Sequence, residues 1–303
     1  MLRRIAIIIC IIILLVSAIS LVTIYTSPKS NAELYNVEEL METIEASDTT
    51  TTNTTEPASE FVSTVTNTST ETTVSETKNL YAWQQLNEKV SGTITVTNLK
   101  SEPIVSTENQ NEYLYSDIKG NYNQNGTLFT AAESILGKSK VTCIFGHNMD
   151  NGAMFGQLDS YTDINYLKEN PSFEITTNDG SFNCKIVGVM FASADYNRND
   201  WYYPQPELTE KEFETFRFQV RSRSLYAIED EFDYNSNYIM LSTCSYGSTN
   251  ERLVVVARIC NDTTDYNVQN NPLVLYTKEY YKEYGISEPS QNALKENYMT
   301  YYS

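Results

Sequence analysis

The sequence holds a single histidine, His147, among 303 residues. A metal site built from several histidines is therefore impossible within one chain. Basic residues are also scarce, because 21 lysines and arginines stand against 39 aspartates and glutamates, for a formal net charge of −18. The long-range field of such a chain repels a phosphate backbone and an anionic lipid surface, so we expect no nucleic-acid partner.

Cysteine occurs five times, an odd number, and no two cysteines form a C-x-x-C pair. Zinc-finger and thioredoxin-type sites therefore lack support. No strong carboxylate cluster demands a metal either, and we expect neither a metal nor another cofactor. Cys143, Cys184 and Cys260 lie inside strand-like runs, where a cysteine behaves as a small hydrophobic residue, so we predict that they are unpaired and buried.

Residues 1–26 have the composition of a cytoplasmic tip and a membrane anchor. Arg3 and Arg4 precede residues 5–25, which are 21 residues without charge. A helix of that length, at about 1.5 Å per residue, spans the roughly 30 Å hydrocarbon core of a bilayer. The arginines hold the N-terminus in the cytoplasm, which predicts a single-pass protein of the cell membrane with an extracellular domain. Cleavage near Ala18, as in a signal peptide, is the alternative.

Residues 27–79 form the predicted extracellular stalk. Apolar residues recur at helical spacing over 32–46, which favours one short amphipathic helix. Residues 47–78 are then mostly threonine, serine and glutamate, and such a segment buries too little apolar surface to offset its ordering entropy. We expect it to be extended and to hold a folded domain away from the bilayer.

Residues 80–277 form the predicted folded domain. Glycine, asparagine, aspartate and proline separate eight short β-like runs: 92–98, 102–107, 126–132, 140–146, 172–177, 182–194, 238–244 and 252–259. So many short strands in under about 200 residues are typical of an all-β barrel or sandwich.

Helices interrupt and precede these strands. One is expected over 208–226, where Thr209 and Glu212 form a capping box. A shorter helix is expected over 80–90. Its inward-facing residues are expected to be Tyr81, Trp83 and Leu86. Residues 278–303 form a C-terminal tail, either helical or loose, whose role does not follow from the sequence.

Three residues at strand ends carry chemistry. His147 follows the run that ends at residue 146, Cys244 ends the run 238–244, and Arg252 begins the next run. Strand ends gather at the rims of a barrel, where side chains reach solvent. A thiol beside an imidazole forms a thiolate–imidazolium pair, and a guanidinium stabilises the oxyanion that forms when a carbonyl is attacked. The three together indicate acyl transfer through a thioester.

Other interpretations stay open at this point. Each residue has an ordinary structural explanation, such as a buried cysteine or a surface arginine. A membrane-tethered cysteine peptidase would use the same nucleophile, with water resolving the thioester. A non-enzymatic surface adhesin would suit the threonine-rich stalk, but it has no need of these three side chains.

The amino-acid sequences of these segments resemble the motifs of one protein family. "LSTC" at a strand end, a variable loop and then "RLVVVARI" resemble the signature of sortases, the extracytoplasmic cysteine transpeptidases of Gram-positive bacteria. "FGHNM" followed by "GAMFGQLDSY" resembles their histidine segment, and "NEYLYSD" and "GTLFTAAES" occur in the same order. The long helix before the "LSTC" strand, ending in "RSRSLY", is similar to class B. The resemblance covers about residues 80–261.

The resemblance implies a fold and a set of site residues. The fold is mainly β, an eight-stranded sortase β-barrel with peripheral helices, here preceded by the predicted transmembrane helix. Cys244 matches the nucleophile, His147 the acid/base and Arg252 the residue that positions the oxyanion or the substrate. The positions that match the substrate groove are Ser242, Thr243 and Leu114. Class B implies no metal.

The resemblance also implies a reaction and partners. Cys244 attacks the threonine carbonyl of a C-terminal sorting signal on a surface protein, and an amine of a peptidoglycan precursor or of a pilin subunit resolves the thioester. Neither the signal sequence nor the acceptor follows from the chain. Ser245 stands where some relatives have an acidic residue, so no acidic contact is expected there. Deleting residues 1–78 is expected to leave a soluble domain with full activity, since anchor and linker alone are removed.

Overall fold

The computed structural model describes residues 29–48, 79–96, 100–109, 111–193, 205–244, 251–260 and 267–302. The predicted anchor and the threonine-rich residues 49–78 lie outside these ranges. Among the described residues, no helix has the length and apolar character needed to cross a membrane.

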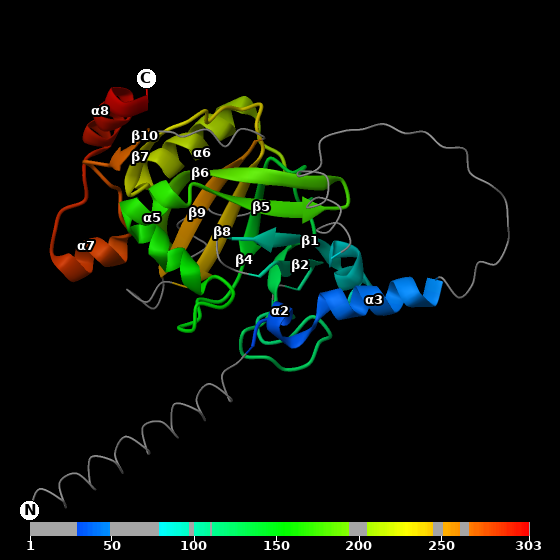
Figure 1. Cartoon of the computed structure of the whole chain (residues 1–303). Coiled ribbons are helices and arrows are strands. Elements are labelled where there is room, and N and C mark those ends of the chain that lie inside the picture. The colour runs from blue at the N-terminus through cyan, green and yellow to red at the C-terminus, as the bar shows by residue number, and fades with distance from the viewer. Residues whose placement is uncertain are drawn as a thin grey trace, which may run out of the picture.

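Eight strands close into a barrel in the order β1-β2-β3-β4-β8-β9-β6-β5 (Figure 1). Their bounds are β1 Val90–Thr95, β2 Glu102–Thr107, β3 Leu128–Ala131, β4 Val141–Phe145, β5 Ser172–Thr177, β6 Gly180–Ser193, β8 Tyr238–Cys244 and β9 Glu251–Cys260. The eight β-like runs of the sequence are these eight strands, so the prediction of a barrel is confirmed. Pairs β2·β3 and β4·β8 are parallel, and the other barrel pairs are antiparallel.

Both faces of the central strands are apolar because both are covered. On β8, Ile239 and Leu241 belong to the cluster that fills the barrel, whereas Met240 packs outside it. The outer cluster is covered by α6 (Glu210–Arg223), which lies against the barrel wall in Figure 1. Alternate residues of a strand point to opposite faces, so a strand buried on both sides reads as a continuous apolar run.

Helix α6 confirms the predicted capping box. The Thr209 hydroxyl accepts from the backbone N–H of Glu212, and the Glu212 carboxylate accepts from the backbone N–H of Thr209. Phe213, Phe216 and Val220 are at most 1% exposed, and burying each side chain contributes about 1.5–3 kcal/mol. This face fixes the helix on the outside of β6, β8 and β9.

A second sheet and the C-terminal tail complete the described fold. Strands β7 (Tyr226–Glu229) and β10 (Asn267–Asn270) form a two-stranded antiparallel sheet that was not predicted from the sequence. The tail is helical, with α7 (Lys278–Tyr284) and α8 (Gln291–Tyr302). Leu294 of α8 is buried against Leu275 and Tyr281, so the tail packs on the domain. Two further short helices are η1 (Gly156–Thr162) and α5 (Ile164–Glu169).

The helix expected over residues 80–90 covers 79–86. Trp83 is buried as predicted, but Tyr81 is 48% exposed, so its expected inward orientation is wrong. Leu80, which is 1% exposed, takes the inward place together with Trp83. The position of Trp83 next to Leu80 and the β1 residue Val90 ties this helix to the barrel.

The segment before the threonine-rich stretch is also structured. Where one helix was expected over 32–46, there are two, α2 (Asn31–Leu34) and α3 (Val37–Asp48), with the chain extended at Tyr35 between them. Asn31 is fully buried, and the ring of Tyr35 meets that of Trp83 edge-on with centroids 6.4 Å apart. Part of the region assigned to the stalk is therefore packed on the folded domain, next to the barrel in Figure 1.

Candidate active site

The end of β8 faces the start of β9. In the antiparallel register of this pair, Cys244 lies directly opposite Arg252. Residues so paired have Cα atoms about 4.5–5.5 Å apart. The next strand pairs Arg252 with Ala192 of β6, so Arg252 lies between two strands of the wall. The sequence-predicted nucleophile and arginine are thus brought together by strand pairing alone.

The end of β4 places His147 at the same end of the barrel as Cys244 and Arg252. Strands β4 and β8 pair in parallel, from Val141 opposite Tyr238 to Phe145 opposite Ser242. The backbone N–H of Gly146 donates to the Ser242 carbonyl at 3.1 Å, which carries the ladder one residue beyond β4. Continuing the register places His147 level with Cys244, about one strand spacing of 4.7–4.9 Å away in the backbone.

Close packing around residue 146, directly before His147, leaves room only for a glycine. A Cβ at Gly146 would collide with Leu128 and would lie 2.8 Å from a ring carbon of Phe155. On its other side, the carbonyl of His147 accepts from the backbone N–H of Phe155 at 2.9 Å. The backbone of His147 is therefore held both by the barrel and by the turn that follows.

The imidazole of His147 contacts the loop between β2 and β3. Its Nε2 lies 2.6 Å from the carbonyl oxygen of Leu114, so Nε2–H is the donor. The ring of Tyr115 lies beside it, with centroids 5.2 Å apart and an angle of 36° between the planes. With Nε2 occupied in this way, Nδ1 is the ring nitrogen left to exchange a proton with a reactant.

The three residues matched to a substrate groove lie in different environments. Leu114 is half-buried beside His147 through its carbonyl. Ser242 is 2% exposed and its carbonyl holds Gly146. Thr243 is 1% exposed, and alternation along β8 turns its side chain to the interior with Leu241. Its hydroxyl oxygen is buried and has no hydrogen-bond partner among the described residues.

Arg252 is anchored at the base of β9. Its Nη1 donates to the backbone carbonyl of Glu251 at 3.0 Å. The carboxylate of Glu251 is itself buried, at 5% exposed, and accepts from the hydroxyl of Thr277, the N-cap of α7. The C-terminal tail therefore contacts the start of the strand that presents Arg252. Neither Glu251 nor Thr277 was predicted to belong near the site, since a glutamate in a polar loop shows no apolar pattern.

The other described cysteines differ from a reactive nucleophile. Cys143 and Cys184 are free and fully buried, whereas Cys260 is half-buried. The prediction is confirmed for the first two, whereas Cys260 is more exposed than expected because it ends β9. Burial raises the pKa of the Cys143 and Cys184 thiols well above the ordinary value, so both stay protonated and unreactive near neutral pH.

Metal chemistry has no support within the described ranges. No group of three or more histidine, cysteine, aspartate or glutamate side chains there could hold a metal ion. The chemistry available at the β4–β8–β9 edge is that of a thiol, an imidazole and a guanidinium.

Comparison with known proteins identifies the fold. The sortase family model, described as a sortase domain, matches residues 94–260. The chain is 28% identical over 166 residues to the sortase B of Listeria monocytogenes, a match covering 53% of this chain and 65% of that protein. The chain thus spans just under two thirds of the length of this curated relative.

Solved structures agree with this match. The structure of sortase B from Listeria monocytogenes is 25% identical and superposes with a TM-score of 0.51, covering 58% of this chain and 97% of that one. A Staphylococcus aureus sortase B–substrate complex is 17% identical with a TM-score of 0.55, covering 61% of this chain and 86% of that one. At that identity the second likeness shows the fold alone.

Proposed function

This chain belongs to the sortase family, and we propose that it is a membrane-anchored cysteine transpeptidase of class B. The observation that carries the proposal is the register of three neighbouring strands. It sets Cys244 opposite Arg252 and brings His147 level with both. Residues from three separate parts of the chain converge on one edge of the barrel, and together they supply a nucleophile, an acid/base and an oxyanion partner.

Cys244 is the nucleophile in this proposal. Proton transfer from its thiol to Nδ1 of His147 gives a thiolate and an imidazolium. The thiolate sulfur forms a bond to the threonine carbonyl carbon of a sorting signal, and the carbonyl oxygen takes up the negative charge. Arg252 stabilises that oxygen in this proposal, because the strand register sets the backbone of Arg252 opposite that of the nucleophile.

His147 then acts as the acid. The carbon–nitrogen bond breaks, the leaving amine takes the proton from Nδ1, and a thioester remains on Cys244. An incoming amine attacks the thioester, gives a proton to Nδ1 and releases the Cys244 thiolate as the new amide forms. The hydrogen bond from Nε2 to the Leu114 carbonyl supports these roles, since it orients the ring through both transfers.

The substrates follow from the family rather than from the described geometry. We propose a surface protein carrying a C-terminal sorting signal as the acyl donor, with Ser242, Thr243 and Leu114 contributing to its groove. The acceptor is an amine of a peptidoglycan precursor or of a pilin subunit. The Staphylococcus aureus protein of the same fold has been solved as a sortase B–substrate complex, which supports substrate binding by this fold.

The location is part of the same proposal. The 21 uncharged residues over 5–25 and the arginines before them support a single membrane anchor, with the catalytic domain outside a Gram-positive cell. An enzyme anchored in this way shares a surface with lipid-bound substrates.

An acyl-enzyme trap tests the function. The full chain in detergent is incubated with peptides carrying candidate sorting signals, without an amine acceptor, and the protein is then digested and analysed by mass spectrometry. We expect an acyl group on Cys244 and, after an amine is added, its transfer to that amine. Release of free acid with no amide product, even at high amine concentration, would identify a hydrolase instead. Modification of any other cysteine, or of none, would refute the proposal.

A further inference from the structure

The imidazole of His147 is held by a loop, and that loop is held by the N-terminal segment. Residues 111–127, between β2 and β3, supply both Leu114 and Tyr115 to the histidine ring. Residues 29–35, here called the N-terminal segment, pack on the other side of this loop. We infer that Asn31 is a positioning residue for His147, acting through loop 111–127. The inference rests on the acid/base role proposed above for His147.

Asn31 binds the loop with both ends of its amide. Its Nδ2 donates to the Thr127 hydroxyl at 3.1 Å and to the Gly126 carbonyl at 3.4 Å. Its Oδ1 accepts from the backbone N–H of Ile118 at 2.8 Å. Asn31 is fully buried, so its amide group is shielded from bulk solvent. One side chain therefore links Ile118, in the middle of the loop, to Gly126 and Thr127 at its end.

Flanking residues extend the contact. The carbonyl of Lys29 accepts from the Asn123 side chain at 2.9 Å, and the Tyr35 hydroxyl donates to Asp117 at 2.8 Å. The backbone N–H of Ala32 donates toward the buried carboxylate of Glu102, at the start of β2. The segment is thus attached along most of its length, with Asn31 at its centre.

The residues that Asn31 binds in turn support the part of the loop that meets the histidine. The Thr127 hydroxyl donates to the Ser116 carbonyl at 2.8 Å, and the Thr127 N–H donates to the Tyr113 carbonyl at 3.0 Å. The carbonyl of Tyr115 accepts from the Asn123 N–H at 2.9 Å. These bonds bracket Leu114 on both sides, so the position of its carbonyl depends on Thr127.

The approach at Gly126 is too close for a side chain. A Cβ there would lie 2.5 Å from the Leu114 oxygen and 2.6 Å from the Tyr113 oxygen, and its φ of +66° favours glycine. The backbone at Gly126 therefore contacts the same carbonyl that accepts from His147. A shift of Gly126, whose own carbonyl accepts from Asn31, would be passed directly to Leu114.

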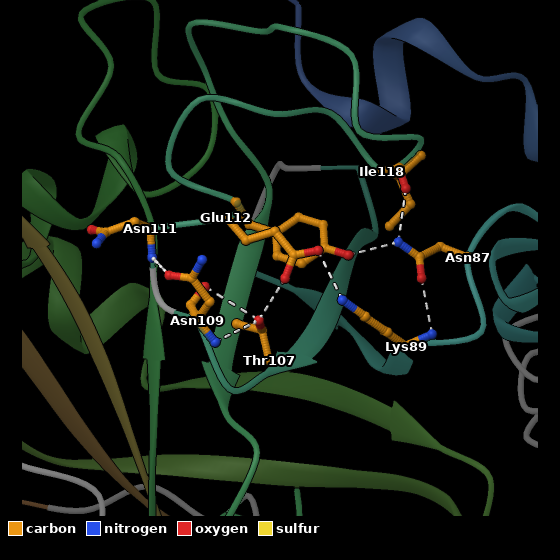
Figure 2. Close-up of polar contacts among 8 residues, drawn as sticks. Asn87, Lys89, Thr107, Asn109, Asn111, Glu112 and Ile118 are labelled. Carbon is orange, nitrogen blue, oxygen red and sulfur yellow. Dashed lines mark hydrogen bonds and ion pairs between the residues drawn. The ribbon is translucent and has the colours of Figure 1, made fainter.

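A second asparagine binds the loop from the barrel side. The Nδ2 of Asn87 donates to the Ile118 carbonyl and to the Tyr113 hydroxyl, both at 2.9 Å. Figure 2 shows Asn87 reaching Ile118, next to the contacts that Lys89 and Thr107 make with Glu112. The peptide groups of Ile118 are therefore fixed on one side by Asn31 and on the other by Asn87. Removing Asn31 leaves the Ile118 N–H without its partner and frees one side of the loop.

The single histidine makes the test direct. The full chain is labelled at histidine with carbon-13 and nitrogen-15 and placed in detergent micelles, and every histidine signal then arises from His147. Asn31→Ala is compared with wild type. Asn36→Ala is the matched control, because Asn36 lies in the same part of the chain and its side chain hydrogen-bonds to Glu39 rather than to loop 111–127. Far-ultraviolet circular dichroism checks that each variant is folded.

In wild type and in Asn36→Ala we expect one narrow imidazole signal, with an Nε2–H proton protected from solvent exchange by Leu114. In Asn31→Ala we expect that proton to be lost to exchange and the ring signals to broaden or split. Peptide turnover should fall about 10–100-fold, the range for a misplaced catalytic group, while the Cys244 thiol remains reactive. Should Asn31→Ala not fold, Asn31→Ser keeps a polar group at the site and is measured instead.

An imidazole signal in Asn31→Ala identical to that of wild type would overturn the inference, whatever the turnover. Equal broadening in Asn36→Ala would also overturn it, since the effect would then not depend on the loop contacts. The imidazole measurement requires no substrate, so it is decided even if the acyl-enzyme trap refutes the proposed function.

Discussion

The stability of the domain should depend on pH through one buried carboxyl, that of Glu102. This residue begins β2 and is 4% exposed, with both carboxylate oxygens 3.3 Å from the backbone N–H of Ala32. Burial raises the pKa of Glu102 from 4.5 to about 7, although hydrogen bonds from Ser30 and Ala32 lower it in part. The folded state therefore binds a proton that the unfolded chain gives up at a lower pH.

The difference between the folded and unfolded pKa values of Glu102 sets the direction and the magnitude of the change in stability with pH. Below about pH 4.5 the carboxyl is protonated in both states, and its full contribution is present. Between about pH 4.5 and pH 7 the folded state keeps a proton that the unfolded chain has released, so stability is lost at about 1.4 kcal/mol per pH unit, and the loss is complete once the pH has risen through 7. The two pKa values differ by about 2.5 units, so the total loss is about 3 kcal/mol.

Many other acids of the chain also titrate in this pH range. The effect of Glu102 is therefore isolated by comparing wild type with Glu102→Gln. The free energy of unfolding is measured with denaturant at intervals from pH 4 to pH 8.5. We expect wild type to lose about 3 kcal/mol relative to Glu102→Gln across this range. Glu88→Gln, at an exposed position, should follow wild type throughout. A difference between wild type and Glu102→Gln that does not change with pH would refute the reasoning.

Substitutions at two residues test the proposed active site. Cys244→Ala should abolish both peptide cleavage and transpeptidation while circular dichroism and melting temperature stay unchanged; retention of a tenth of wild-type turnover would place the nucleophile elsewhere. Arg252→Ala should lower turnover about 10²–10³-fold, the usual effect of removing an oxyanion donor. Arg252→Lys should recover only part of it, since an ammonium lacks the planar fork of donors. Near-normal turnover in Arg252→Ala would leave Arg252 outside the site.

The barrel strands could be predicted because each is marked locally. The run 252–259 is apolar throughout, and polar turns bound it, so a strand follows from the residues themselves. The nearness of Cys244 and Arg252 follows almost as directly, since β8 and β9 are consecutive antiparallel strands. His147 is different, because it reaches Cys244 through the parallel pairing of β4 with β8. That pairing joins segments almost a hundred residues apart. The sequence indicated only that strand ends gather at a barrel rim, and the family resemblance added the role of His147.

The contacts of the N-terminal segment could not be predicted in the same way. Composition describes residues 27–79 as polar and poor in apolar surface, which is typical of a linker. The segment docks through specific hydrogen bonds of Asn31 and Tyr35, and a buried amide shows no periodic pattern in a sequence. The contact of Tyr115 with the His147 imidazole also shows no pattern in the sequence, so it is known only from the folded structure.

The contacts of residues 29–35 with loop 111–127 change the expected effect of deleting the N-terminal part of the chain. Removing residues 1–28 keeps the N-terminal segment, and such a chain should match the full one in melting temperature and in turnover of a soluble peptide. Removing residues 1–78 also removes Asn31, so the inference about Asn31 predicts less than the full activity expected from the sequence. We expect lower stability and a broadened His147 signal in the longer truncation. Equal activity and equal imidazole signals in both chains would show that the segment is not needed.

Together with the proposed anchor, the same contacts predict that the domain lies close to the bilayer. If the proposed anchor ends at residue 25, four residues lead to Lys29, and a chain spans at most about 3.6 Å per residue, or roughly 14 Å. The strand directions set the start of β2, where Glu102 meets the segment, at the same end of the barrel as the ends of β4 and β8. The catalytic edge should therefore lie near the lipid surface, rather than at the reach of a fifty-residue stalk. A fluorophore on Tyr122→Cys, at a position 81% exposed in loop 111–127, should be quenched by spin labels on lipid headgroups in vesicles carrying the full chain. A label that escapes quenching would show that the domain stands away from the membrane, and that the segment does not hold it there.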